Sequence, residues 1–162
     1  MYMKRLISLI LTAILFTSTA CASGSKSTST DTTKEVLSMK LNIQIDNGTS
    51  KHTLTATIYD NSSSRALVEL LQKSSITIGM HDYVNFEKVG SLPSSLPRND
   101  TQITTEPGDI ILYQGNQITI YYDTNSWNFT RLGKIDGMTK VELKKILGKG
   151  NVTAMLSIET NQ

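Results

Sequence analysis

The chain has 162 residues, a single cysteine and a formal charge of +2 at neutral pH, from 16 basic and 14 acidic side chains. The basic residues form no block, which argues against a nucleic-acid partner. A chain of this length buries roughly two-thirds of its unfolded surface in one core, so we expect one domain that needs no disulfide bond.

The first 20 residues predict a signal peptide. A short basic start precedes an apolar run at residues 6–16, which is too short to span a bilayer comfortably. Two processing sites overlap behind it: residues 18–21 resemble a bacterial lipobox, and residues 20–22 fit ordinary signal cleavage. The lipobox begins with serine rather than the usual aliphatic residue. We favour lipidation at Cys21, because a lone thiol in an exported protein has no partner within the chain.

A flexible tether is predicted over residues 21–36, which are rich in Ser and Thr and lack an apolar pattern. Removal of the signal peptide takes away two basic residues, which leaves 14 basic and 14 acidic side chains. We therefore expect a neutral folded domain over residues 37–160, held outside the cell membrane by a lipid anchor or otherwise secreted.

The first folded elements are a hairpin, a helix and a strand. Apolar residues alternate on both sides of a turn at residues 46–48, which predicts two paired strands over residues 39–58. A capping residue among 60–62 then begins a short helix. The apolar stripe of this helix consists of Ala66, Leu67, Leu70 and Leu71. A strand follows at residues 75–80.

The alternation breaks up over residues 81–104. Pro93, Pro97 and repeated serines favour a long ordered loop here rather than sheet. Loops of this length in compact domains are usually functional or disordered.

The most regular pattern is a second hairpin, with strands at residues 109–114 and 117–123. Gly115 and Asn116 predict a two-residue type II′ turn between them. Both faces of this hairpin are largely apolar, so we expect it to be central in its sheet and covered on each side. An irregular polar and aromatic segment is predicted at residues 125–129.

A helix and a strand complete the chain. Thr139 and Glu142 form a capping box, and Gly148 is the expected end of the helix. The last strand is expected at residues 151–158. Many short strands with two short helices predict a mainly β domain, a closed or nearly closed antiparallel β-barrel.

Several segments resemble the bacterial cyclophilin-like domain family: YDN at 59–61, LPRND at 96–100, GDIILYQGNQITIYYD at 108–123 and TRLGKI at 130–135. The resemblance covers roughly residues 39–158 and implies the same barrel with two short helices. Cyclophilins isomerise X–Pro bonds with an arginine beside a pocket, but their Phe-Met-x-Gln-Gly-Gly segment is absent here. The family also implies a redox partner as a third hypothesis, since some relatives are fused to flavodoxin-like domains.

Two functions are considered, the first from the residues in the two loops that flank the second hairpin and the second from the resemblance. The first is a non-catalytic module that binds a peptide or a small polar ligand between two irregular loops. The alternative is an extracytoplasmic peptidyl-prolyl isomerase of low activity. The candidate ligand-binding residues are Arg98, Asn99, Trp127, Asn128 and Arg131.

Two of these residues have structural alternatives. The guanidinium of Arg98 either binds a carboxylate or amide of a ligand, or it forms a salt bridge with Asp100 or a neighbouring acid and holds the loop. Trp127 either lines a cleft or plugs the rim of the barrel. His81 and Asp82 form a conceivable acid–base pair, but no nucleophile lies beside them. We therefore predict no catalytic set, no metal site and no cofactor.

Overall fold

The structure is a computed structural model that describes residues 39–148 and 150–159. The predicted signal peptide (1–20), the tether (21–36) and Cys21 lie outside the described residues. The elements of the described part are β1 (Lys40–Asp46), β2 (Lys51–Ile58), α2 (Ser62–Lys73), β3 (Ile76–Tyr83), β4 (Glu87–Ser91), β5 (Thr101–Thr104), β6 (Asp109–Tyr113), β7 (Gln117–Tyr121), β8 (Ser126–Ile135), α3 (Lys140–Leu147) and β9 (Val152–Ile158).

The strands form a closed antiparallel barrel, which confirms the predicted fold class. Neighbours follow the order β2-β1-β9-β3-β4-β7-β6-β8, and pairing of β2 with β8 closes the ring. The short strand β5 pairs with the first half of β8, outside the ring. Closure satisfies the backbone groups that an open sheet would leave at its edges.

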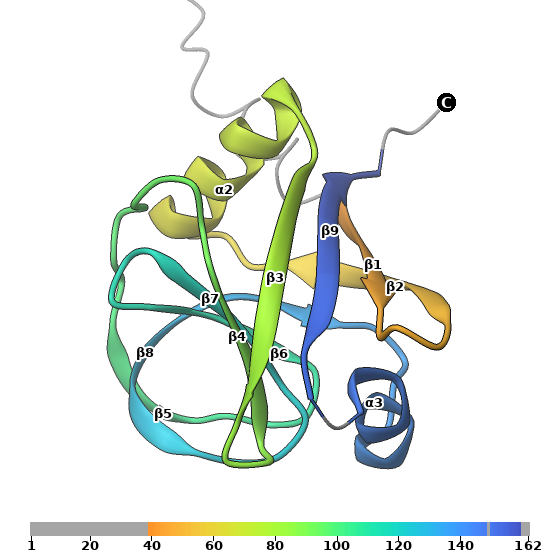
Figure 1. The fold of residues 1–162 in the computed structure, drawn as a ribbon. Coiled ribbons are helices and arrows are strands. Elements are labelled where there is room, and N and C mark those ends of the chain that lie inside the picture. Colours follow the sequence, from red (N-terminus) through yellow and green to blue (C-terminus); the bar gives the residue numbers. More distant parts are fainter. Residues whose placement is uncertain (1–38, 149, 160–162) are drawn as a thin grey trace, which may run out of the picture.

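Apolar side chains fill the inside of the barrel because they alternate along each strand. Ile43 and Ile45 of β1, Ile110 of β6 and Ala154 of β9 are fully buried there. Because α2 precedes β3, α3 precedes β9, and these two strands are antiparallel, the helices lie at opposite ends of the strand pair (Figure 1).

Local sequence signals define both helices as predicted. The side chain of Asn61 caps α2 by accepting a hydrogen bond from the Ser64 backbone N–H at 2.9 Å. Thr139 and Glu142 form the expected capping box of α3, and Gly148 ends that helix at φ 58°.

The second hairpin, β6–β7, is central as predicted, since β4 and β8 flank it. Its turn is one residue longer than predicted: Tyr113 pairs with Gln117, and Gln114 and Gly115 both have positive φ. The two-residue type II′ turn is therefore wrong. The turn is closed by a hydrogen bond from the Asn116 N–H to the Tyr113 carbonyl oxygen.

The predicted long loop over residues 81–104 is also wrong, because β3 continues to Tyr83 and β4 and β5 occupy much of the rest. The predicted irregular segment at 125–129 is wrong too, since β8 begins at Ser126. Residues 101–104 and 126–129 pair with one another, so each segment is a strand because the other supplies its backbone hydrogen-bond partners. Neither segment has a local sequence pattern that predicts a strand. In β4, two charged residues are buried, and charges are usually read as solvent-exposed.

Candidate functional site

A cavity of about 370 Å³ opens on the outer face of the barrel wall, over β3, β4, β7, β6 and β8. Its lining residues alternate in sequence with residues of the barrel core, such as Met80, Ile118 and Leu112, so they face away from that core. Five aromatic residues line it: Tyr83, Tyr113, Tyr121, Trp127 and Phe129. The polar lining consists of His81, Glu87, Gln117, Thr119 and Asn125.

The register of the strands brings the central lining residues together. Tyr83 of β3 lies opposite Glu87 of β4, and Glu87 lies opposite Tyr121 of β7. In the adjacent row, Val89 lies opposite Thr119. Directly opposed residues on one face of a sheet have β-carbons about 4.5–5.5 Å apart, so these side chains form one continuous surface.

Aromatic rings form a connected layer beneath and around the cavity. Phe86 stacks on Tyr121 at 6.0 Å between ring centroids, and Tyr83 meets Phe86 edge-on at 5.7 Å. Tyr121 and Phe129 lie 5.8 Å apart, and Tyr113 meets Phe129 at 6.1 Å. Together with buried Ile111, this second apolar cluster fixes the shape of the cavity floor.

A carboxyl group lies in this floor. Glu87 is only 7% exposed, and its Oε2 has no hydrogen-bond partner among the described residues. Burial raises the pKa of Glu87, against the smaller lowering effect of the Tyr121 and Thr119 hydroxyls that face it. Thr119 Oγ1 is likewise buried without a partner among those residues. Buried polar atoms of this kind are rare and call for an explanation.

Tyr121 supports the same site from the neighbouring strand. It is 1% exposed, and burial followed by the nearby Glu87 carboxyl raises the pKa of its hydroxyl. The phenol therefore stays protonated and remains a hydrogen-bond donor at any physiological pH.

The ammonium group of Lys88, the residue that follows Glu87, does not form an ion pair with the Glu87 carboxylate. Lys88 points to the opposite face of β4 and is completely buried. Its Nζ lies 2.7 Å from Asp82 Oδ1 and donates to the Gly148 and Gly150 carbonyl oxygens at 3.0 and 2.8 Å. All three ammonium donors are thus used within the barrel wall, and the Tyr122 hydroxyl donates to the same Asp82 carboxylate.

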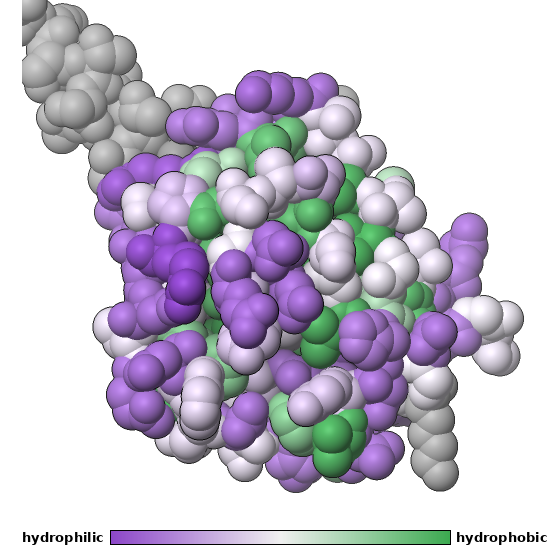
Figure 2. Space-filling view, turned by 60° about the vertical axis from the view of Figure 1, so that its left-hand side comes forward, coloured by the Kyte–Doolittle hydropathy of each residue, from purple (hydrophilic) through white to green (hydrophobic). Residues whose placement is uncertain are grey.

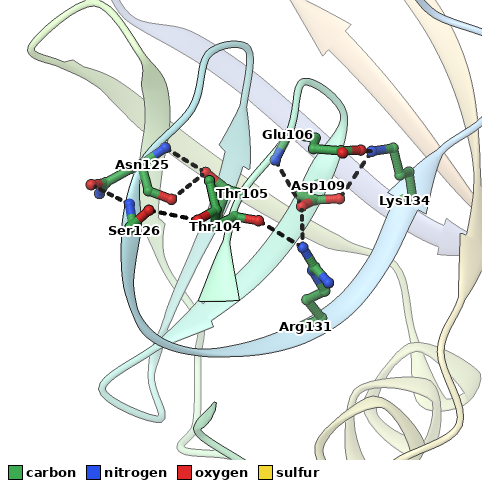
Figure 3. Close-up of polar contacts among 8 residues, drawn as sticks. All are labelled: Thr104, Thr105, Glu106, Asp109, Asn125, Ser126, Arg131 and Lys134. Atoms are coloured by element: carbon green, nitrogen blue, oxygen red, sulfur yellow. Dashed lines mark hydrogen bonds and ion pairs between the residues drawn. The ribbon is translucent and has the colours of Figure 1, made fainter. Parts of the chain in front are cut away.

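A second polar cluster anchors the segments that border the cavity (Figure 3). The Asp109 carboxylate is almost fully buried and forms ion pairs with Arg131 and Lys134, each at 3.3 Å. The backbone N–H of Asn125 donates to Thr105 Oγ1 at 2.9 Å, and the Thr105 N–H donates to the Asn125 carbonyl oxygen at 2.7 Å. These contacts hold Asn125 at the edge of the cavity.

The predicted site residues do not form one cluster, and two of them lie in the loop before β5. Arg98 donates from Nε to Asp100 Oδ2 at 2.8 Å, which is the structural alternative foreseen for it. Asn99 ties the same loop to the start of α2, because its Nδ2 donates to the hydroxyls of Ser62 and Ser63.

The other three predicted residues lie on β8. Trp127 is 59% exposed and lines the cavity. Asn128 points to the opposite face and lies across from Gln102 of β5. Arg131 shares the face of Trp127, but its Nη2 is held by Asp109 and by the Thr104 carbonyl oxygen at 2.8 Å. The structure therefore brings only Trp127 of the five into the cavity, and the ligand-binding roles of all five stay predictions.

Sequence reasoning missed Glu87, Thr119 and Tyr121 as site residues. Thr119 and Tyr121 share one face of the predicted strand at 117–123, which is a usable signal, although that face was predicted to be largely apolar and covered. Glu87 lay in a segment assigned to a loop. Only the pairing of β4 with β7 places its carboxyl beside the other two.

Other kinds of site receive no support from the described residues. Within residues 39–148 and 150–159, no group of three or more His, Cys, Asp or Glu side chains is arranged to hold a metal ion. In the same ranges, no helix has the length and apolar character needed to cross a membrane. On the face shown in Figure 2, hydrophilic residues predominate and hydrophobic ones gather in small separate groups.

Comparisons with known proteins agree with this architecture. The model of the cyclophilin-like family matches residues 43–159, which is more than half of the chain. Among solved structures, the chain is similar to the solution structure of the hypothetical protein AF2241 from Archaeoglobus fulgidus, with 14% sequence identity and a TM-score of 0.50. That alignment covers 75% of this chain and 95% of the other, and at this identity it shows the fold alone. No curated protein matches the chain. The protein belongs to the cyclophilin-like family.

Proposed function

We propose that this domain is a binding module that holds a small polar ligand or a peptide segment in the outer cavity. The observation that carries the proposal is the combination of an aromatic lining with the buried Glu87 and Thr119 side chains, each with an oxygen that lacks a partner within the described residues. Ligand sites are typically apolar cavities of roughly 300–1,000 Å³ with a few polar groups, and this cavity lies within that range.

The single tryptophan of the chain provides a direct test. Trp127 lines the cavity and is exposed, so its fluorescence reports ligands that enter. A library of amino acids, short peptides and small metabolites is titrated into the protein, and the hits are verified by amide chemical-shift changes in β4, β7 and β8. Binding that shifts none of these strands contradicts the proposed site.

Two neighbouring variants locate the ligand. We expect Trp127→Ala to weaken binding about tenfold or more, because truncation of a large aromatic contact costs more than 1 kcal/mol at a binding hot spot. Asn128→Ala is the matched control, since Asn128 is the next residue but faces the opposite side of β8. The reverse order of effects would favour the site predicted from the loops.

We further propose that the chain is exported and anchored to the outer side of a bacterial cell membrane through lipidated Cys21. Support comes from the basic start, the apolar run and the lipobox-like residues 18–21. Cys21→Ala is expected to release the protein from the membrane fraction, because the acyl chains carry the attachment. Wild-type protein found wholly in the soluble fraction contradicts the anchor.

A second candidate function is a weak peptidyl-prolyl isomerase. The aromatic cavity has the character of a surface that accepts a proline ring, which favours this alternative. The guanidinium groups of Arg98 and Arg131 are both engaged with carboxylates, which argues against it. In a protease-coupled proline isomerisation assay, we expect the wild type to be no faster than Arg98→Ala. A rate well above that variant supports the enzyme.

A further inference from the structure

The cavity floor contains a buried acid to which the described part of the protein supplies no cation. The ion pairs of residues 39–148 and 150–159 do not include Glu87. Lys88, its neighbour in sequence, is directed to the other face of the strand, where Asp82 and two carbonyl oxygens use all its donors. A buried carboxylate without a cation is costly, so this position is poorly explained by folding stability.

The groups around Glu87 favour a positively charged partner. Tyr83 and Trp127 line the same cavity and are exposed, and the faces of aromatic rings attract cations within about 6 Å. Glu87 Oε2 has no partner among the described residues and is an available acceptor. A ring-lined space with a carboxylate at its base is the arrangement that recognises an ammonium group, since rings and acid act on the same charge.

The cavity also sets limits on the charged ligand. Its volume of about 370 Å³ is sufficient for a short aliphatic ammonium group. A ligand anion would meet the Glu87 carboxylate and the negative faces of the rings, so charge selects against it.

We propose that the outer cavity recognises an alkylammonium group, with its positive charge against Glu87 and its methyl or methylene groups against the aromatic rings. This inference rests on the proposed function, because it names the chemistry of the ligand that the module binds. The ammonium group belongs either to a free small amine or to a lysine side chain of a peptide.

The test compares charged ligands with uncharged ligands of similar shape. Choline is paired with neohexyl alcohol, in which carbon replaces the quaternary nitrogen. N-acetyl-lysine methylamide is paired with its norleucine analogue. Binding to the full chain is followed by Trp127 fluorescence. We expect at least one ammonium ligand to bind about tenfold more tightly than its neutral partner, the effect of attraction between its charge and the aromatic rings and carboxylate. Preference for choline points to a free amine, and preference for the lysine compound points to a peptide.

Two variants separate recognition from folding. Glu87→Gln keeps the shape of the side chain and is expected to remove the preference for the ammonium ligand while the neutral partner binds as before. Glu69→Gln is the matched control on the exposed face of α2 and is expected to change neither. Should Glu87→Gln fail to fold, the comparison of charged and neutral ligands on the wild type still decides.

The outcomes distinguish this inference from the proposed function. Equal binding of charged and neutral ligands, or a preference that survives Glu87→Gln, overturns ammonium recognition and leaves the cavity as a binding site. The absence of any response to the ammonium probes also overturns it. The proposed function fails separately, when the wider library gives no ligand that shifts the strands of the cavity.

Discussion

Glu87 and Lys88 are consecutive residues of β4, yet their charged groups lie on opposite faces of the barrel wall. The ammonium of Lys88 reaches Asp82 and two carbonyl oxygens from the segment before β9. Glu87 faces the outer cavity with one oxygen unpartnered among the described residues. At the scale of single residues, one buried charge therefore holds segments together, and the other is buried without a cation among the described residues.

Removal of the Lys88 ammonium is expected to destabilise the barrel. In Lys88→Met, the Asp82 carboxylate loses its cation, and the Gly148 and Gly150 carbonyl oxygens lose a donor. Breaking one side of a buried ion pair typically costs about 3–5 kcal/mol. Urea unfolding measures this cost, with the exposed Lys145→Met of α3 as a control expected to stay within about 0.5 kcal/mol. Equal stability of the two variants would show that the Lys88 contacts contribute little.

Glu87 is expected to make stability depend on pH. Because burial raises the pKa of Glu87 in the folded state, the folded protein binds more protons than the unfolded chain between the ordinary pKa and the raised one. Stability therefore falls as pH rises through that window. Glu87→Gln removes this penalty, so the variant should be more stable than the wild type at neutral pH and lose that advantage in acid.

The groups that face Glu87 require a second comparison. His81 and Tyr83 from β3, Tyr113 from β6 and Tyr121 from β7 line the same cavity, and His81 is the basic side chain among them. Thermal unfolding of Glu87→Gln and of His81→Gln across pH separates the two contributions. A Glu87→Gln variant that is less stable than the wild type at neutral pH would contradict a buried carboxyl without a cation.

At the scale of elements, the turn between β3 and β4 carries backbone strain at the edge of the cavity. Val84 and Asn85 both have positive φ, at 47° and 62°. A β-branched residue is rarely found in this region, whereas asparagine tolerates it. The turn nonetheless closes with a hydrogen bond from the Phe86 N–H to the Tyr83 carbonyl oxygen. Strained residues cluster at binding sites, which fits the position of Tyr83 at this cavity.

Two reciprocal substitutions test the strain. Val84→Asn should stabilise the protein by about 1 kcal/mol, because it places a tolerant side chain at the strained position. Asn85→Val should destabilise it by a similar amount. Both side chains are exposed, so loss of packing contributes little to either result. Chemical denaturation measures both, and a stability change of the same sign in the two variants would contradict backbone strain as the cause.

At the scale of the whole molecule, the ring of strands closes where β2 meets β8. Ala56, Thr57 and Ile58 pair with residues 133–135 there, after a bulge in the pairing of β6 with β8. Gly133 makes the close approach possible, since a β-carbon built on it would lie 2.5 Å from the Thr57 carbonyl oxygen. Closure thus depends on the absence of a side chain at one position.

Gly133→Ala is expected to destabilise the barrel by about 1–3 kcal/mol, the usual cost of overpacking, because a backbone carbonyl cannot move aside as a side chain can. Gly79→Ala in β3 is the matched control. A β-carbon at Gly79 would have no neighbour within 4 Å, and this glycine does not have positive φ. The control should be neutral or slightly stabilising. Thermal unfolding compares the two, and similar melting temperatures would contradict a tight closure at Gly133.

The sequence by itself determined the elements whose signals are local. Alternating apolar residues defined the hairpins, Asn61 and the Thr139–Glu142 box defined the helix starts, and two apolar faces placed the hairpin at 109–123 in the middle of the sheet. The tertiary structure alone decided the strand status of residues 87–91 and the position of the cavity. Lys88 is buried only because Asp82 and the carbonyl oxygens of Gly148 and Gly150 reach it. Glu87 meets Tyr121 only because β4 pairs with β7. A buried charge depends on partners that are distant in the chain, and no local pattern records them.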